Sequence, residues 1–214
     1  MRKEAPEYGI INDMNIRYLA ETEGFIKPFQ PQNVKEIKRL KGNEAYAYTE
    51  KIGALSFGTS SFGYDFTLAE DLYEMQVDYT TELNVKAFDL KKHTRKLPIY
   101  EDEFGRFAVL PPHSFVLGHT VEYVRMPDDL LGICFDKSTY ARIGGIQTNV
   151  TPIEPGWQGQ ITLEIRNTLP CFTRLYVNEG LIQTIFLRGV RPETTYADKK
   201  GKYQGQTNVT GAKV

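Results

Sequence analysis

The segment that decides the fold is Gln160-Ile161-Thr162-Leu163-Glu164-Ile165-Arg166-Asn167, in which apolar and polar side chains alternate. This period of two places the two isoleucines and Leu163 on one face of a β-strand, and Thr162 and Glu164 on the other. Similar short runs of aromatic and β-branched residues, with turn residues between them, occur at 62–68, 106–110, 114–124 and 180–187. Many short strands with little helix between them predict an all-β fold, a distorted jelly roll or β-barrel.

One short helix is expected near the start of the chain. Asn12 or Asp13 supplies its N-cap, Gly24 ends it in a left-handed conformation, and Ile16, Leu19 and Ala20 share one face. Residues 30–50 are polar and rich in lysine, and their pattern assigns them to no element. No internal repeat, low-complexity segment or linker is present, so residues 1–214 are expected to form a single domain whose C-terminal tail begins at about residue 190.

The composition excludes several classes of protein. The chain has 214 residues, with 26 basic against 27 acidic residues and a net charge of -1. This balance gives no bulk electrostatic attraction to nucleic acid or to an anionic membrane. The apolar stretches are far shorter than the roughly 18 residues that cross a bilayer, and the N-terminus lacks the apolar core of a secretory signal. Two cysteines make no disulfide framework, so a cytoplasmic protein with neither nucleic acid nor membrane as partner is expected.

The first candidate for chemistry is the hexapeptide Lys137-Ser138-Thr139-Tyr140-Ala141-Arg142. A lysine, two hydroxyls and an arginine one turn later can present several hydrogen-bond donors and positive charge to a phosphate. The alternative is an N-capped surface turn with solvated charges, since serine and threonine are common caps. The hexapeptide alone leaves both interpretations open.

Glu164 and the C-terminal tail are the other two candidates. A carboxylate in a covered strand has a raised pKa and is suited to proton transfer, whereas on a wet strand face it is only a solubilising charge. The tail, residues 196–207, mixes basic, aromatic, amide and glycine residues. It either folds as a lid over a polyphosphate or is a frayed terminus.

The sequence lacks the signatures of several known sites. No H-x-E followed by P-C-x-x-C is present, which disfavours a zinc deaminase, and neither cysteine has a second cysteine at ligand spacing. The phosphate-binding loop of P-loop proteins and the Rossmann fingerprint are also absent.

Taken together and in order, several segments resemble the dCTP deaminase family of the dUTPase-like superfamily. The resemblance extends over nearly the whole chain, and the segments that carry it are Ser56–Asp65, Lys137–Arg142, Asn149–Pro155, Gly156-Trp157, Thr162-Leu163-Glu164, Glu179-Gly180 with Gln183, and Tyr196–Thr210. The resemblance implies a jelly-roll subunit of a homotrimer with nucleotide sites at the subunit interfaces. It also implies deamination of dCTP to dUTP with release of ammonia, Mg²⁺ bound with the triphosphate, and dTTP as an inhibitor.

The resemblance also implies roles for individual residues. Glu164 matches the catalytic glutamate, which takes a proton from water and passes it to the base. Ser138, with a backbone carbonyl near Thr151 or Pro152, is expected to hold that water, and Arg142 to stabilise developing charge and orient the glutamate. The expected nucleotide contacts are Lys137, Ser138, Thr139, Thr151, Glu154, Thr162, Gln183, Tyr196, Lys202 and Gln206. No metal ligand is expected from the protein, because Mg²⁺ enters with the nucleotide and zinc takes no part.

Two departures from the family pattern leave alternatives open. Asp136 stands where relatives usually have glycine, and residues 143–148 are less apolar than usual. A second dUTPase activity, which yields dUMP and diphosphate, and a preference for dCMP are therefore the alternatives within this class. A nucleotide-binding jelly-roll protein without catalysis is the alternative from another class.

Overall fold

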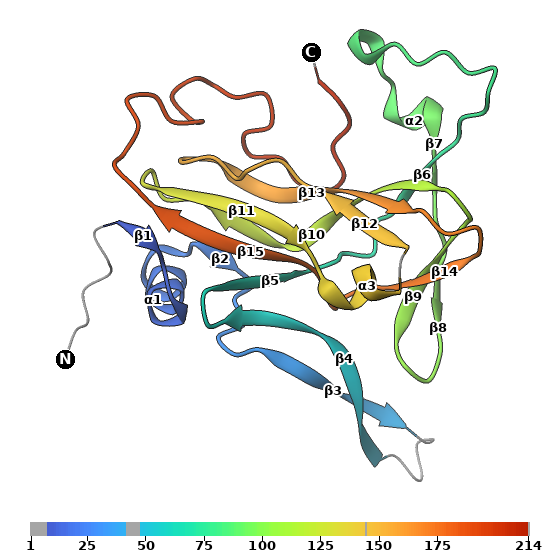
Figure 1. Ribbon diagram of the computed structural model, residues 1–214, viewed down its shortest axis with the longest axis horizontal. Coiled ribbons are helices and arrows are strands. Elements are labelled where there is room, and N and C mark those ends of the chain that lie inside the picture. Colours follow the sequence, from blue (N-terminus) through green and yellow to red (C-terminus); the bar gives the residue numbers. More distant parts are fainter. Residues whose placement is uncertain (1–7, 42–47, 144, 214) are drawn as a thin grey trace.

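The computed structural model describes residues 8–41, 48–143 and 145–213, and antiparallel strands are its main secondary structure (Figure 1). The described elements are, in chain order, β1 (Gly9–Ile10), α1 (Asp13–Glu23), β2 (Ile26–Lys27), β3 (Val34–Lys41), β4 (Tyr48–Ser60), β5 (Gly63–Thr67), β6 (Tyr73–Met75), the 3₁₀ turn η1 (Val85–Ala87), α2 (Leu90–His93), β7 (Thr94–Lys96), β8 (Ile99–Glu101), β9 (Arg106–Leu110), β10 (Phe115–Arg125), β11 (Leu130–Asp136), α3 (Ser138–Arg142), β12 (Ile146–Asn149), β13 (Gln158–Asn167), β14 (Thr173–Tyr176) and β15 (Gly180–Arg188). The predicted all-β class is confirmed.

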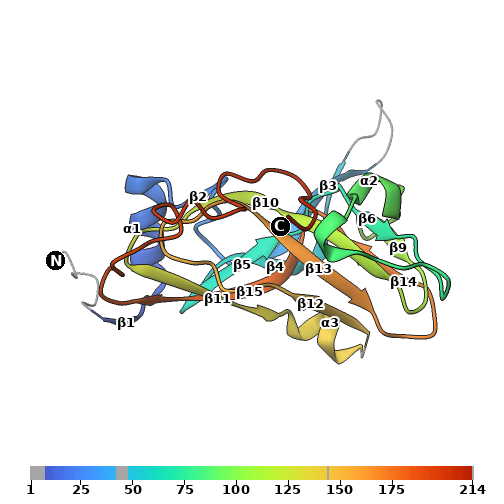
Figure 2. The ribbon, with the colours of Figure 1, turned by 90° about the horizontal axis from the view of Figure 1, so that it is seen from above.

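The strands form three antiparallel sheets. The first has the order β1-β15-β5-β4-β3, with β11 also paired to β15. The second has the order β12-β13-β10-β6-β7, with β2 also paired to β10, and the third has the order β14-β9-β8. Strands far apart in the sequence therefore lie next to each other, and β13, between β12 and β10 in the second sheet, lies beneath the C-terminal tail (Figure 2).

Side chains from both large sheets meet in one apolar core. Tyr64 and Phe66 of β5 have ring centroids 4.9 Å apart, and Phe25 meets Phe186 of β15 edge-on at 4.9 Å. Leu163 of β13 is fully buried on the opposing sheet. This burial supplies most of the driving force for folding and fixes which face of β13 turns outward.

The predicted N-terminal helix is confirmed in its cap, its end and its buried face. The side chain of Asn12 accepts a hydrogen bond from the backbone N–H of Asn15 at 3.1 Å, and Gly24 ends α1 with a left-handed φ of 65°. Residues 30–50, for which the sequence predicts no element, contain β3 and the first residues of β4. The two strands form a hairpin at the edge of the first sheet and project beyond its other strands (Figure 1).

A carboxyl group of β10 lies inside the core. One carboxyl oxygen of Glu122, Oε2, accepts a hydrogen bond from the backbone N–H of Thr67 at 3.1 Å. The other, Oε1, accepts one from the hydroxyl of Thr67 at 3.1 Å. Burial raises its pKa to about 7. Because removal from water penalises the charged form, this carboxyl stays protonated at pH values where an exposed glutamate is ionised.

Glu122 is expected to make the protein less stable as the pH rises from about 5 to about 8. The unfolded chain releases this proton near pH 4.5 but the native protein holds it up to about pH 7. In this window the native state binds more protons, so the free energy of unfolding falls as pH rises. Glu122→Gln removes the titration at nearly constant shape, and its melting temperature at about pH 8 should exceed that of the wild type. Calorimetry between about pH 5 and about pH 8 measures how the free energy of unfolding of each protein changes with pH. The same pH dependence in the variant and the wild type would show that Glu122 does not cause it.

Candidate active site

Glu164 lies at the middle of β13, on the face opposite the core. In the sheet it pairs with Leu117 of β10 on one side and with Asn149 of β12 on the other. The side-chain amide of Asn149 donates a hydrogen bond to the carboxylate of Glu164 at 2.8 Å. The carboxyl group is half-buried, so it is held in place while one side stays open to a ligand.

A pocket of about 920 Å³ opens over this face of β13. Its floor contains Thr162, Glu164 and Arg166, which share one face because they are two residues apart. Phe115 and Leu117 of β10 continue the floor, and Met75 lies beside them. The pocket is within the size range of sites for ligands as large as a nucleotide.

The C-terminal tail forms the opposite wall of this pocket. The backbone carbonyl of Tyr203 accepts a hydrogen bond from the indole N–H of Trp157 at 3.1 Å, and the hydroxyl of Tyr196 accepts one from the backbone N–H of Tyr203 at 3.0 Å. The chain passes directly over the ring of Tyr196 at Gly201, where a Cβ atom would lie only 2.2 Å from the ring. These contacts within one subunit fix the path of the tail independently of a nucleotide.

Gln206 joins the tail to the pocket floor. Its side-chain amide donates hydrogen bonds to the carbonyl of Gln160 at 2.8 Å and to the hydroxyl of Thr162 at 3.3 Å. Its side-chain oxygen is buried and has no hydrogen-bond partner among the described residues. This oxygen is available to accept a hydrogen bond from a ligand in the pocket.

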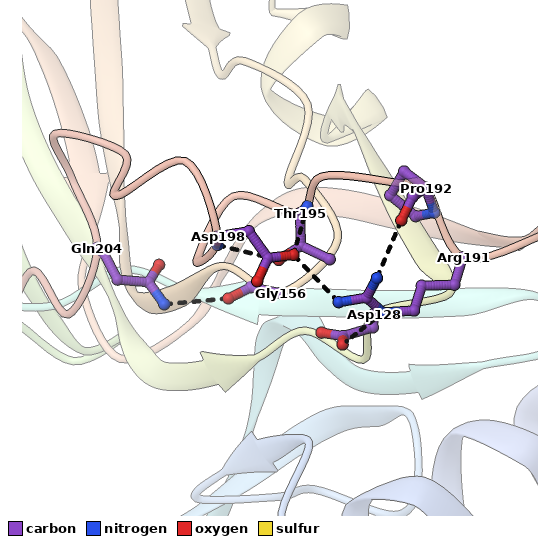
Figure 3. A network of polar contacts seen from close by, with 7 residues as sticks. All are labelled: Asp128, Gly156, Arg191, Pro192, Thr195, Asp198 and Gln204. Atoms are coloured by element: carbon purple, nitrogen blue, oxygen red, sulfur yellow. Dashed lines mark hydrogen bonds and ion pairs between the residues drawn. The ribbon is translucent and has the colours of Figure 1, made fainter.

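A polar network fixes the beginning of the tail (Figure 3). The guanidinium group of Arg191 lies between two carboxylates, 3.1 Å from Asp128 and 3.0 Å from Asp198. Asp198 also accepts hydrogen bonds from the backbone N–H and the hydroxyl of Thr195 at 2.9 and 2.8 Å. The hydrogen bonds and the arginine together hold the pKa of Asp198 below its usual value. Further along, Gln204 donates to the carbonyl of Gly156 at 3.0 Å (Figure 3).

The hexapeptide forms α3, with the hydroxyl residues on its outer side. Ser138, Thr139 and Arg142 are exposed, whereas Lys137 and Tyr140 are buried. The hydroxyl of Tyr140 accepts a hydrogen bond from the backbone N–H of Tyr176 at 3.0 Å. Two anchors therefore face inward and leave the three other side chains free to meet a ligand or another subunit.

The structure brings together half of the residues expected at the site. The expected residues that line the pocket are Thr151, Glu154, Thr162, Glu164, Tyr196 and Gln206. The expected residues outside the lining are Lys137, Ser138, Thr139, Arg142, Gln183 and Lys202. Their roles stay predictions.

Asp136, one of the two departures from the family pattern, has a local structural role. Asp136 accepts a hydrogen bond from the backbone N–H of Thr148 at 2.7 Å and so ties the end of β11 to β12. The altered loop begins at Ile143, and its second residue, Gly144, lies outside the described residues.

Sequence reasoning missed several residues of the site. Asn149 and Trp157 belong to segments that carry the resemblance, but their side-chain contacts depend on the sheet register and on the tail. Arg166 lies two residues from Glu164 on the same strand face, and this spacing could have predicted that Arg166 faces the pocket. The segment between β6 and β7 contributes an apolar wall of Leu83, Val85 and Phe88, and no pattern in the sequence indicates that these residues reach the pocket.

The described residues form neither a cluster of metal ligands nor a membrane-spanning helix. Among residues 8–41, 48–143 and 145–213, no three histidine, cysteine, aspartate or glutamate side chains are grouped so that they could hold a metal ion. None of the helices in this part of the chain combines the length and apolar character required to span a bilayer.

Comparisons with known proteins agree with these observations. The sequence model of the dCTP deaminase-like family matches residues 10–189. The dCTP deaminases of Erythrobacter litoralis and of Thioalkalivibrio sulfidiphilus are each 42% identical over 202 residues, which is 94% of this chain and 97% of theirs. The crystal structure of 2'-deoxycytidine 5'-triphosphate deaminase from Agrobacterium tumefaciens shares the fold, with a TM-score of 0.52 and 19% identity over 86% of this chain and 49% of that chain. The chain belongs to the dCTP deaminase-like family, as its motifs predict.

Proposed function

We propose that this protein is a hydrolytic deaminase that converts dCTP to dUTP and ammonia. Membership of the dCTP deaminase-like family supports this reaction. Two relatives that are 42% identical over nearly their full length are named dCTP deaminase. The observation that carries the proposal is the position of Glu164, a half-buried carboxylate on the floor of a nucleotide-sized pocket. A carboxylate held in this way can move protons to and from a bound pyrimidine.

Hydrolysis at C4 of cytosine requires several proton transfers, which one carboxylate can perform in sequence. Glu164 takes a proton from water as the oxygen bonds to C4, and delivers a proton to N3. It then takes the remaining proton from the new C4 hydroxyl and transfers it to the amino group, which leaves as ammonia when the C4–N bond breaks and the C4 carbonyl forms. The hydrogen bond from Asn149 at 2.8 Å keeps the carboxylate oriented during these steps.

The pocket of one chain lacks the positive charge that a triphosphate needs. The charged side chains that line it, within the described residues, are Glu154, Glu164 and Arg166, and Glu154 is paired with Lys199. The exposed side of α3 presents Ser138, Thr139 and Arg142 outside this pocket. In our proposal, α3 of a neighbouring subunit in a homotrimer completes the site, with Ser138 holding the water and Arg142 stabilising developing charge.

Other features of the proposal rest on the family resemblance. Mg²⁺ is expected to arrive with the triphosphate, the reaction is expected to proceed without zinc, and dTTP is expected to inhibit. The contacts of Gln183 and Lys202 with the nucleotide and the cytoplasmic location belong with these expectations.

A product assay tests the proposed function. The purified protein with dCTP and Mg²⁺ is expected to release one ammonia for each dUTP formed, and the products are separated by ion-exchange chromatography. Formation of dUMP and diphosphate would replace the proposal by the bifunctional enzyme, and selective turnover of dCMP would replace it by a monophosphate deaminase. Nucleotide binding without ammonia release would identify a sensor. Parallel reactions with dCMP and dUTP distinguish these outcomes.

A further inference from the structure

A buried ion pair connects the start of α3 to the middle of β5. The ammonium group of Lys137 lies 2.7 Å from the carboxylate of Asp65, and the two side chains are only 8% and 5% exposed. The two strands involved are not adjacent, because β15 lies between β11, which ends just before Lys137, and β5. The lysine side chain therefore crosses β15 to reach its partner.

The sheet is built to let this side chain pass. A Cβ atom at Gly180 of β15 would lie 3.2 Å from Cε of Lys137 and 2.0 Å from the carbonyl oxygen of Ser56. Glycine is the residue that leaves room both for the lysine stem and for the approach of β4 at this point. The crossing thus depends on three segments that are distant in the sequence.

We infer that Asp65 is a positioning residue for the proposed reaction, and that Lys137 acts through Asp65 instead of binding the nucleotide phosphates. This inference rests on the proposed function. The lysine immediately precedes Ser138, and the ion pair fixes the backbone from which Ser138 and Arg142 project. Tyr140 provides a second inward anchor, but its hydrogen bond to the backbone of β14 carries no charge.

The electrostatics favour this assignment over a direct phosphate contact. Two buried charges stabilise each other strongly in a medium of low polarity, and removing one leaves the other uncompensated. If Lys137 turned to a phosphate, the carboxylate of Asp65 would remain buried without its cation. The second oxygen of Asp65 is buried and has no hydrogen-bond partner among the described residues, so the ammonium group is its essential partner.

The two assignments predict opposite effects of Asp65→Asn. If the pair positions α3, this change reproduces the defect of Lys137→Met, and kcat for dCTP falls about tenfold to a hundredfold in both variants. If Lys137 binds phosphate, Asp65→Asn frees the ammonium group, and the KM for dCTP stays the same or falls while kcat is retained. The second result would overturn the inference.

The double variant Asp65→Asn/Lys137→Met removes both charges and guards against misfolding, since replacing a buried pair as a unit is well tolerated. Its kcat should match that of the single variants, because all three lose the same interaction. A double variant with wild-type kcat would overturn the inference.

A binding measurement separates positioning from phosphate contact without any turnover. Titration calorimetry of deoxyuridine, dUMP, dUDP and dUTP gives the ratio of dissociation constants between successive ligands, and each ratio reports on one phosphate. We expect the double variant to keep every wild-type ratio; a ratio that moves towards one would show that Lys137 contacts that phosphate and would overturn the inference. Glu74→Gln is the matched control, because it also replaces a buried carboxylate that takes part in an ion pair. Glu74 pairs with Arg95 at 2.7 Å, but it lies on β6 of the second sheet, away from α3 and from the Lys137–Asp65 pair. Its kcat should remain that of the wild type. If the wild-type protein released no ammonia from dCTP, the proposed function would fail by that result alone, whereas the binding ratios would still report on Lys137.

Discussion

Replacement of Glu164 by glutamine is expected to lower the rate of ammonia release from dCTP at least about a hundredfold. The amide keeps the shape of the side chain and can still accept the hydrogen bond from Asn149. It has no basic oxygen with which to take a proton from water, so the chemical step fails while the pocket remains intact. Steady-state kinetics with ammonia detection measures the loss, and binding of the product dUTP should change little.

A carboxylate-to-amide change remote from the pocket provides the control for this experiment. Glu36 of β3 is exposed and forms an ion pair with Lys51 at 3.3 Å on the extended hairpin. Glu36→Gln should leave kcat and KM unchanged. Near-normal turnover by the Glu164 variant would reject its role as proton shuttle, whatever the control shows.

Two inactive variants are expected to restore activity when they assemble together. Arg142→Ala and Glu164→Gln should each lower turnover about a hundredfold or more on their own. If each site combines Glu164 of one subunit with Arg142 of the next, each ring of three that contains both variants has an intact pair at about a third of its sites. Co-expression with two affinity tags, followed by sequential purification and kinetic assay, measures the recovery.

The corresponding control mixes Glu164→Gln with the double variant Arg142→Ala/Glu164→Gln, in which every site lacks the carboxylate. This mixture should remain inactive. Absence of recovery in the first mixture would show that the two residues do not meet across subunits, and would refute the interface model of the site.

The sequence predicted β13 well because one local property, the alternation of apolar and polar residues, determines it. Alternation from Ile161 to Ile165 places the apolar residues in the core and Glu164 outside it, whatever its neighbours are. The same holds for α1, whose cap at Asn12 and left-handed Gly24 are local features. The β3–β4 hairpin escaped prediction because both of its faces are exposed over much of its length, so Lys38, Arg39 and their neighbours show no apolar period.

The site was only partly predictable, because it depends on which segments meet. Glu164 was a candidate from its position in a strand, Gln206 was expected from the family resemblance, and the structure places both on one pocket. Lys137 has the charge expected of a phosphate contact, but residue type cannot reveal that Asp65, 72 residues away, neutralises it. The apolar wall formed by Leu83, Val85 and Phe88 likewise depends on how the segment between β6 and β7 folds back over the sheet.

The indole contact described for the tail has a practical consequence. Trp157 is the sole tryptophan of the chain, and it is buried where the pocket meets the tail segment around Tyr203. The intrinsic fluorescence excited at long ultraviolet wavelengths therefore originates from a single chromophore at the ligand-facing junction. The protein carries its own label-free optical reporter, which follows occupancy and tail displacement without any engineered dye.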